Sequence, residues 1–179
     1  MGKYMIELTI HSYNSSGQLN IKLQKMRIDK IIVDKKKYLN LLLLADEQES
    51  MIDRYLDRGE MFVMYDSENE PICSAVITDE GNDICELKNL AVSLQHQRKG
   101  YGKRMVNFLC THYANRFKSI IVGTGDSIQT VSFYKSCGFY YSHTIPDFFT
   151  KNYVHPIIEN GKVLKDMIYF RRNLVYSLM

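Results

Sequence analysis

The chain has 179 residues, of which 45% are hydrophobic, so it can bury one sizeable core but hardly two. Its net charge of +3 comes from basic and acidic residues scattered along the sequence, which argues against the concentrated basic face of a nucleic-acid-binding protein. No apolar run approaches the length of a membrane span, and residues 1–10 lack the pattern of a signal peptide. We therefore expect a single-domain cytoplasmic protein that interacts with neither nucleic acid nor membrane.

The cysteines and histidines do not have the spacing of a metal or redox site. The cysteines are Cys73, Cys85, Cys110 and Cys137. They form no CxxC pair and no Cys/His cluster, and the histidines form no HExxH pair. Each cysteine lies in an apolar segment, where thiols usually act as small core residues. We therefore expect no metal.

Residues 1–25 predict a β-hairpin. Residues 4–10 alternate between apolar and polar side chains, 14–17 have the composition of a turn, and the apolar residues alternate again over 19–23. A further strand is predicted at 26–33 and opens the main domain.

The domain boundary follows from this division. We place a domain at 26–179 and treat 1–25 as an N-terminal segment. Two origins of this segment stay open. It is either an added β-hairpin that extends the sheet, or an extension from a vector or an upstream start, in which case Met26 is the natural first residue.

Two helical segments follow the strand at 26–33. Asp34 is placed to cap a helix over 35–45, which has apolar residues on one side. A second helical segment follows at 51–56, and Gly59 is placed to end it.

The middle of the chain predicts a meander of strands and then a crossover. Strands at 61–65, 72–78 and 84–92 are joined by short polar turns and should be antiparallel. An amphipathic helix over about 102–116 leads to a buried strand at 119–122. Because a strand, a helix and a neighbouring strand form a right-handed crossover, the strands at 84–92 and 119–122 should run parallel. The pattern indicates an α+β fold with a mixed, mostly antiparallel sheet.

The C-terminal part combines a helix, an aromatic insertion and a last strand. A helix is predicted at 128–136, and an irregular aromatic segment interrupted by a proline follows over 140–154. A turn at 159–162 precedes a final strand at 164–174. The insertion is longer than a hairpin needs, and long loops in compact domains are often functional.

A glycine loop joins the strand at 84–92 to the helix that follows it. Gly100 and Gly102 stand where the hydrophobic period changes from strand to helix. The first turn of a helix leaves backbone N–H groups without partners and carries the positive end of the macrodipole, so anions bind there. Basic side chains surround this turn: Arg98, Lys99, Lys103 and Arg104. The loop suits a phosphate or pyrophosphate, although a plain connection with solvated basic residues has the same pattern.

Two sequence blocks resemble a known family. Gln97-Arg98-Lys99-Gly100-Tyr101-Gly102 resembles the Gln/Arg-x-x-Gly-x-Gly/Ala signature of the GNAT superfamily of acyl-CoA-dependent N-acyltransferases. Residues 132–139 resemble its second block, a helix that carries Phe-Tyr-x-x-x-Gly-Phe. The resemblance covers about 26–174 and is strongest over 86–139. It implies a single-domain GNAT-like fold whose sheet is splayed at the central parallel strand pair and flanked by helices.

The resemblance also implies the binding of acetyl-CoA as a co-substrate. Backbone groups after the middle of the strand at 84–92 would pair with pantetheine, and the amides of the glycine loop would hold the pyrophosphate. The implied cofactor-binding residues are Leu90, Ala91, Val92, Gln97, Arg98, Lys99, Gly100, Tyr101, Gly102, Lys103 and Ser127. Ser127 stands where the family often has a cofactor-contacting Asn, and its side chain has a shorter reach.

Two side chains are implied to carry the chemistry. Tyr134, in the position of the motif tyrosine, would protonate the departing sulfur, and a backbone N–H near Leu90 would polarise the thioester carbonyl. Glu86 lies eleven residues before Gln97 and resembles the general base of the histone-acetyltransferase branch. Tyr134 as a packing residue and Glu86 as a surface residue are the alternatives.

The predicted function is transfer of an acetyl group from acetyl-CoA to a primary amine by direct attack. In the family the helices at 35–56 line the acceptor site, so Asp46, Glu47 and Glu49 either attract a cationic amine or form an ordinary solvated face. The aromatic insertion favours a small-molecule acceptor over a peptide or protein chain, and it would also suit the surface of a homodimer. The alternative functions are a protein acetyltransferase and a CoA-binding regulatory module without turnover.

Overall fold

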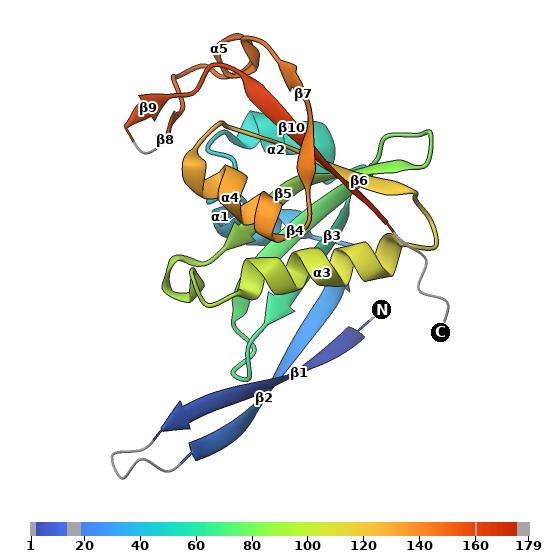
Figure 1. The fold of residues 1–179 in the computed structure, drawn as a ribbon, viewed down its shortest axis with the longest axis vertical. Coiled ribbons are helices and arrows are strands. Elements are labelled where there is room, and N and C mark those ends of the chain that lie inside the picture. Colours follow the sequence, from blue (N-terminus) through green and yellow to red (C-terminus); the bar gives the residue numbers. More distant parts are fainter. Residues whose placement is uncertain (1–2, 14–18, 160, 175–179) are drawn as a thin grey trace.

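The computed structural model describes residues 3–13, 19–159 and 161–174, and its central element is an eight-stranded sheet (Figure 1). The strands are β1 (Lys3–Tyr13), β2 (Leu19–Ile31), β3 (Glu60–Tyr65), β4 (Pro71–Asp79), β5 (Ile84–Val92), β6 (Ser119–Thr124), β7 (Tyr140–Ile145) and β10 (Met167–Asn173). Their order is β1-β2-β3-β4-β5-β6-β10-β7. Among these strands, neighbours are antiparallel except β5 and β6, which are parallel.

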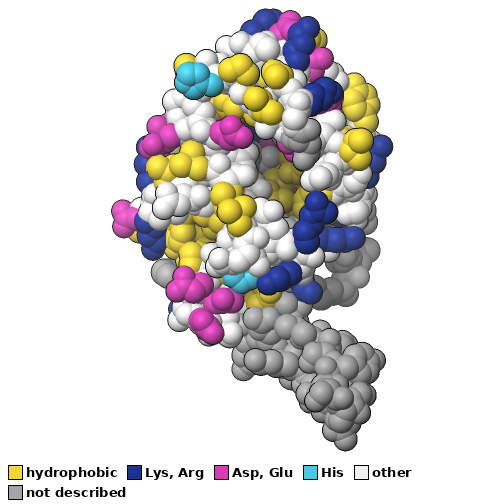
Figure 2. Space-filling model, turned by 90° about the vertical axis from the view of Figure 1, so that its left-hand side faces the viewer, with side chains coloured by type: hydrophobic (Ala, Val, Ile, Leu, Met, Phe, Trp, Pro, Cys, Tyr) yellow, Lys and Arg dark blue, Asp and Glu magenta, His cyan; other side chains and the backbone are white. Residues whose placement is uncertain are grey.

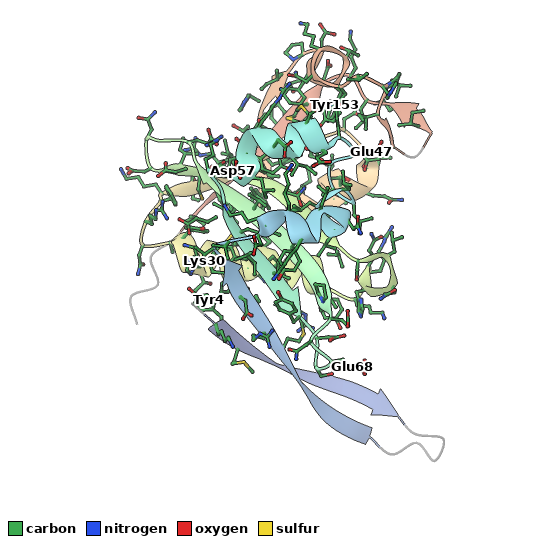
Figure 3. The ribbon with its side chains drawn as sticks, turned by 180° about the vertical axis from the view of Figure 1, so that it is seen from behind. Tyr4, Lys30, Glu47, Asp57, Glu68 and Tyr153 are labelled. Carbon is green, nitrogen blue, oxygen red and sulfur yellow. The ribbon has the colours of Figure 1, made fainter. Side chains whose placement is uncertain are left out.

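Helices cover both faces of this sheet. They are the short 3-10 helices η1 (Lys35–Tyr38) and η2 (Leu94–His96) and the helices α1 (Leu39–Leu42), α2 (Glu49–Leu56), α3 (Tyr101–Tyr113), α4 (Ile128–Ser136) and α5 (Phe148–Asn152). Helices α3 and α4 lie in front of the sheet in Figure 1, whereas α1 and α2 lie in front of it in Figure 3, which is the view from behind. A separate two-stranded ribbon, β8 (Ile158–Glu159) and β9 (Lys162–Val163), lies beside the large sheet.

The sheet separates two hydrophobic cores, and β3 contributes to both. Phe62 and Met64 pack toward α3, whereas Met61, Val63 and Tyr65 pack toward α1 and α2. Successive side chains of a strand point to opposite faces, so a strand that is covered on both sides is apolar throughout. Each fully buried large apolar side chain contributes roughly 1.5–3 kcal/mol to stability.

The expected fold class is confirmed, and so is the parallel pairing of β5 with β6. Their ladder is short, from Ile84↔Ser119 to Glu86↔Ile121. Beyond Glu86, β5 keeps β4 as its partner but β6 turns away. A bulge at Lys88, which separates the pairs Ile77↔Leu87 and Val76↔Asn89, bends β5 at this point. The gap that opens between the diverging strands positions the site.

The N-terminal hairpin is continuous with the domain strand. The strands predicted at 19–23 and 26–33 form one strand, β2, which pairs with β1 over Leu19–Asp29 and with β3 only over Arg27–Ile31. The outer half of the hairpin therefore extends away from the rest of the sheet (Figure 1). The turn predicted at 14–17 lies outside the described residues, and the boundary between 25 and 26 stays a prediction.

The helix expected over 35–45 is wrong in its type, length and cap. The chain forms η1 and then the single turn α1. Asp34 has a φ of 53°, in the left-handed region, and makes no capping hydrogen bond. An N-cap normally has extended backbone that directs its side chain to the first turn, and Asp34 does not. Instead, Lys35 Nζ donates to the carbonyls of Leu56 (2.8 Å) and Gly59 (2.7 Å), which holds this turn against the end of α2.

The segment expected to be irregular over 140–154 contains two regular elements, β7 and α5. Strand β7 pairs with β10 from Met167↔Ile145 to Arg171↔Tyr140. Its hydrogen-bond partner therefore comes from a strand far along the chain, which local composition does not reveal. Within the described ranges, none of the helices has the length and apolar character that a membrane crossing requires.

Candidate active site

Two adjoining cavities lie where β5 and β6 diverge. The first, of about 480 Å³, is lined by the end of β5, the glycine loop, the start of α3 and α4, and we call it the loop cavity. The second, of about 430 Å³, is lined by β5, β6, the end of α1, α2 and the segment between β7 and β10. We call this segment (146–159 and 161–166) the arm and the second space the arm cavity. Both are lined by Leu44, Leu90, Thr130 and Tyr134.

The glycine loop presents a helix start to the loop cavity. Arg98 (φ 60°) and Gly100 (φ 85°) have left-handed backbone, and Gly100 is the N-cap of α3. The first α-helical bond in this turn runs from the N–H of Arg104 to the carbonyl of Gly100 (3.1 Å). The preceding N–H groups of α3 therefore have no partner within the helix and are available to an anion.

Gly102 allows three elements to meet at this point. A Cβ at Gly102 would lie 3.3 Å from Phe133 Cζ and 3.5 Å from Val92 Cγ2. A Cβ at this position would therefore be in ordinary contact with β5 and would require the Phe133 ring of α4 to shift by a few tenths of an ångström. The pattern Gly-x-Gly thus has two separate reasons, a left-handed backbone at Gly100 and close packing at Gly102.

Most of the predicted cofactor-binding residues meet in one place. Those that line the loop cavity are Leu90, Ala91, Val92, Gln97, Arg98, Gly100, Tyr101, Gly102 and Lys103. Lys99 and Ser127 are not among the described residues that line it. Figure 2 shows the side of the molecule that is on the left in Figure 1. This side has a hollow with hydrophobic side chains on its floor and Lys and Arg side chains along its right-hand margin.

Ser127, whose contact with the cofactor stays a prediction, has hydrogen-bond partners within the chain. It is the N-cap of α4, and its Oγ accepts a hydrogen bond from the N–H of Thr130 (3.3 Å). The same hydroxyl donates to Glu159 Oε1 (2.7 Å) in the arm, and Thr130 Oγ1 donates to the same oxygen (2.8 Å). Ser127 therefore fastens the arm to the start of α4.

Tyr134 lies at the boundary of the two cavities. It projects from α4, is 7% exposed, and packs edge-on against Phe133 and Phe139 with ring centroids 5.1 and 5.6 Å away. Burial raises the pKa of the Tyr134 phenol, and the charges of Cys137 and Glu159 act in the same direction. The phenol therefore stays protonated, which a proton donor requires.

Glu86 is buried rather than on the surface. It is the last residue of β5 that pairs with β6, it is 6% exposed, and it lines the arm cavity. Its Oε1 accepts a hydrogen bond from the Tyr169 hydroxyl (3.1 Å), and its Oε2 forms an ion pair with Lys88 Nζ (2.8 Å). Burial, together with the charge of Glu86, raises the pKa of Tyr169, so the phenol remains a hydrogen-bond donor to the carboxylate.

A network of polar side chains ties the arm to α1 and α2 across the arm cavity. The hydroxyls of Tyr153 and Tyr55 donate to the Asp46 carboxylate, at 3.1 and 3.5 Å. Asn89 Nδ2 in turn donates to Tyr55 Oη (3.1 Å) and to the Leu42 carbonyl (3.0 Å). Figure 3 shows Tyr153 and Glu47 at the same end of the molecule, where the arm lies next to α2. Burial raises the pKa of Asp46, against the lowering effect of its hydrogen bonds.

The three acidic residues predicted near the acceptor separate into two groups. Asp46 and Glu47 line the arm cavity. Glu49 instead forms an exposed ion pair with Lys36 (2.8 Å) at the start of α2. Only two of the three therefore face the cavity.

Known proteins with similar sequences cover most of the chain. A family model described as "Acetyltransferase (GNAT) domain" matches residues 57–141. An uncharacterized N-acetyltransferase of Bacillus subtilis, YvbK, is 33% identical over 151 residues, which are 83% of this chain and 96% of YvbK. The chain belongs to the GNAT family.

Solved GNAT structures agree with this assignment. A GNAT family acetyltransferase from Elizabethkingia anophelis, solved with acetyl-CoA bound, has a TM-score of 0.79 and 31% identity and covers 83% of this chain and 98% of its own. A Bacillus subtilis acetyltransferase in complex with CoA has a TM-score of 0.77 and 32% identity, with coverages of 84% and 99%. The protein is an acetyl-CoA-dependent acyltransferase, and acetyl-CoA is its co-substrate.

The residues around the loop cavity of this GNAT protein have features that suit coenzyme A. The unpartnered amides at the start of α3 and the side chains of Arg98 and Lys103 suit a diphosphate. The edge of β5 beyond Glu86 has no strand partner on the β6 side among the described residues, so it can pair with an extended chain such as pantetheine. Among the described residues, no cluster of three or more His, Cys, Asp or Glu could hold a metal.

Sequence reasoning missed several residues of the arm cavity, chiefly Asn89, Thr130, Tyr153 and Glu159. Asn89 left a usable signal, because it is a polar residue inside the apolar run of a buried strand. Glu159 left none: it lies in what reads as a turn, and its partner Thr130 is 29 residues away.

Proposed function

We propose that this GNAT enzyme transfers the acetyl group to a primary amine of a small molecule by direct attack of the amine nitrogen. The observation that carries the proposal is the meeting of the two cavities at Leu90, Thr130 and Tyr134. One cavity suits the co-substrate and the other the acceptor, so the two reactants would meet at a buried tyrosine.

The chain would supply three functions at this junction, while acetyl-CoA supplies an activated thioester. The loop amides and the β5 backbone would hold and orient the co-substrate, and a backbone N–H near Leu90 would stabilise the oxyanion. Tyr134 would give its phenolic proton to the departing sulfur. Its raised pKa keeps that proton in place until it is needed.

Glu86 is the proposed acceptor of the amine proton, directly or through water. It lines the arm cavity, and its carboxylate is held by Tyr169 and Lys88. A base oriented in this way is ready for proton transfer without rearrangement.

The enclosure of the arm cavity favours a small acceptor over a protein chain. Besides the bond between Tyr153 and Asp46, the N–H of Val154 donates to Gln48 Oε1 (3.0 Å) and Arg54 donates to Asn152 Oδ1 (3.0 Å). These bonds hold the arm over the cavity. Its volume of about 430 Å³ lies within the usual range for small-ligand sites.

The test is release of the CoA thiol from acetyl-CoA by the purified full chain, with polyamines, amino acids, aminoglycosides and peptides as acceptors. We expect turnover with at least one small amine and slower turnover with peptides. Binding of acetyl-CoA in calorimetry without turnover of any amine would instead indicate the regulatory module. Faster turnover of peptides than of every small amine would point to a protein acetyltransferase.

A further inference from the structure

The arm cavity has more acidic charge than its basic groups neutralise. Of the residues that the structure describes, four carboxylates line it, those of Asp46, Glu47, Glu86 and Glu159, together with one cation, Lys88. Lys88 forms its ion pair with Glu86. The remaining carboxylates form no ion pair with any Lys, Arg or His of the described residues.

Two of these carboxylates are held in place by neutral donors. Asp46 accepts from the hydroxyls of Tyr55 and Tyr153, and Glu159 accepts from those of Ser127 and Thr130. Neutral hydroxyls orient a carboxylate but leave its charge uncompensated. A half-buried carboxylate in this state is stabilised by a cation that enters the cavity.

Asp46 and Glu159 belong to opposite walls. Asp46 lies between α1 and α2 and is linked through Tyr55 to Asn89 of β5. Glu159 is fastened to the start of α4, directly after β6. Asp46 is therefore linked to the β5 side of the arm cavity, and Glu159 to the side of α4, which follows β6.

Asn89, on the same wall as Asp46, gives independent evidence that this wall lacks a hydrogen-bond donor. It lines the cavity and is 2% exposed, and its Oδ1 has no hydrogen-bond partner among the described residues. Its amide orientation is set by the Leu42 carbonyl, which needs the Nδ2 donor. An unpaired buried acceptor destabilises the protein, so a ligand that brings N–H donors to this wall would relieve that penalty.

Apolar side chains also line the arm cavity, namely those of Phe148, Phe149, Leu164 and Met167. A ligand that satisfies all of these features has cationic nitrogen at both ends and a hydrocarbon between them. A metal ion does not fit, because the described residues gather no metal-binding cluster.

We propose that the acceptor is a small aliphatic diamine, and that Asp46 and Glu159 determine this specificity. This inference rests on the proposed function for the choice of site. Thr130, which donates to Glu159, lines both cavities, so Glu159 would receive the amine that reacts. Asp46, with Asn89 beside it, would hold the second, charged nitrogen.

The first test compares diaminobutane with n-butylamine, which has the same chain length and one nitrogen fewer. We expect kcat/KM for the diamine to exceed that for the monoamine by at least about tenfold, the usual effect of one hydrogen bond to a charged group. The substitutions Asp46→Asn and Glu159→Gln keep the shape and the acceptor oxygens and remove the charge. Each should bring the ratio of diamine to monoamine kcat/KM toward one.

Glu49→Gln is the matched control, because Glu49 carries the same charge at the start of α2 and pairs with Lys36 outside the cavity. It should leave the ratio as in the parent protein. Acetyl-CoA affinity, measured by calorimetry for every variant, shows that each has folded.

Calorimetry of diaminobutane with the protein alone separates this inference from the proposed function. Binding that Asp46→Asn weakens, without turnover of any amine, would support the diamine site and overturn the proposed catalysis. Equal kcat/KM for the two amines, with no weakening in either charge-removed variant, would overturn the diamine site even if both amines were acetylated.

Discussion

The Tyr134 side chain lies between the two cavities, and burial keeps its phenol protonated. Its ring packs against Phe133 of α4 and against Phe139, which follows the helix, so the two contacts orient the phenol. The two aromatic neighbours come from the same sequence block as the tyrosine itself. This block therefore encodes both the proposed acid and the packing that orients it.

Tyr134→Phe should remove the proton donor and keep the ring packing. We expect kcat to fall by about 10²-fold or more, the usual contribution of a positioned acid, while acetyl-CoA affinity in calorimetry stays close to that of the parent. Because burial raises the pKa of this phenol, the parent should show no loss of kcat from Tyr134 as pH rises toward the ordinary tyrosine value of about 10. An unchanged kcat in the variant would remove Tyr134 from the mechanism.

Gly100→Asp should weaken acetyl-CoA binding through charge as well as strain. Its φ of 85° disfavours any side chain by about 1–2 kcal/mol, and an added carboxylate near a diphosphate costs about 1 kcal/mol more per close charge pair in water. We expect at least about fivefold weaker binding in calorimetry. Gly81→Asp, at φ 76° in the turn before β5, is the control and should lose stability but not affinity. Equal affinities in the two variants would contradict a diphosphate site at the loop.

At the scale of elements, α3 contributes both to the hydrophobic core and to the lining of the site. Its buried stripe, which includes Met105, Val106 and Leu109, packs on the sheet, and its first turn lines the loop cavity. The packing therefore determines where the unpartnered amides point. The strands also shape the site. β5 bends at the Lys88 bulge and pairs with β6 over only a short ladder, which opens the gap beside the start of α3.

Leu109→Ala should destabilise the fold without altering the ligand-lining residues. Leu109 is fully buried, and removal of such a side chain costs about 2–5 kcal/mol. Urea denaturation should show this loss, while Thr111→Ala, on the exposed side of the same helix, should change stability by less than about 0.5 kcal/mol. A cost for Leu109→Ala no larger than that for Thr111→Ala would mean that α3 is not anchored through this stripe.

At the scale of the whole molecule, a charged network joins the sheet to α3 on the side away from the cavities. Glu60 of β3 accepts hydrogen bonds from Lys30 of β2 (2.5 Å), from Tyr113 of α3 (3.0 Å) and from Arg116. Lys30 and Glu47 stand on opposite sides of Figure 3, which shows the separation of this network from the arm cavity. Burial alone would raise the pKa of Glu60, but the three donors outweigh it and lower the pKa to about 2.

Glu60→Gln should therefore lower stability at neutral pH and not in strong acid. A carboxyl whose pKa is lower in the folded state stabilises the fold above its unfolded value of 4.5, and this contribution disappears as pH falls toward about 2. Urea denaturation at several pH values should show two curves that converge over that range. A difference that stays constant down to pH 2 would contradict the linkage.

Local sequence determined a large part of this protein. The strand 84–92 and the helix 128–136 are predicted with the bounds that β5 and α4 have, because turn residues stand at their ends. The glycine loop was predicted because Gly100 and Gly102 mark the change of period. The family signature lies in the same stretch, so fold class, co-substrate and the proposed acid could all be inferred from a short part of the chain.

The arrangement of the residues around the arm cavity, the proposed acceptor site, was decided only by the tertiary structure. Glu159 meets Ser127, Tyr153 meets Asp46, and Tyr169 meets Glu86 across 32, 107 and 83 residues. No period or motif records such contacts, because they arise when the arm packs over two diverging strands. The same reason explains the error at Asp34, whose backbone is set by the docking of Lys35 on α2 and not by its own capping preference. Sequence thus determined the glycine loop that we propose holds the co-substrate, and long-range packing decided the shape and charge of the cavity beside it.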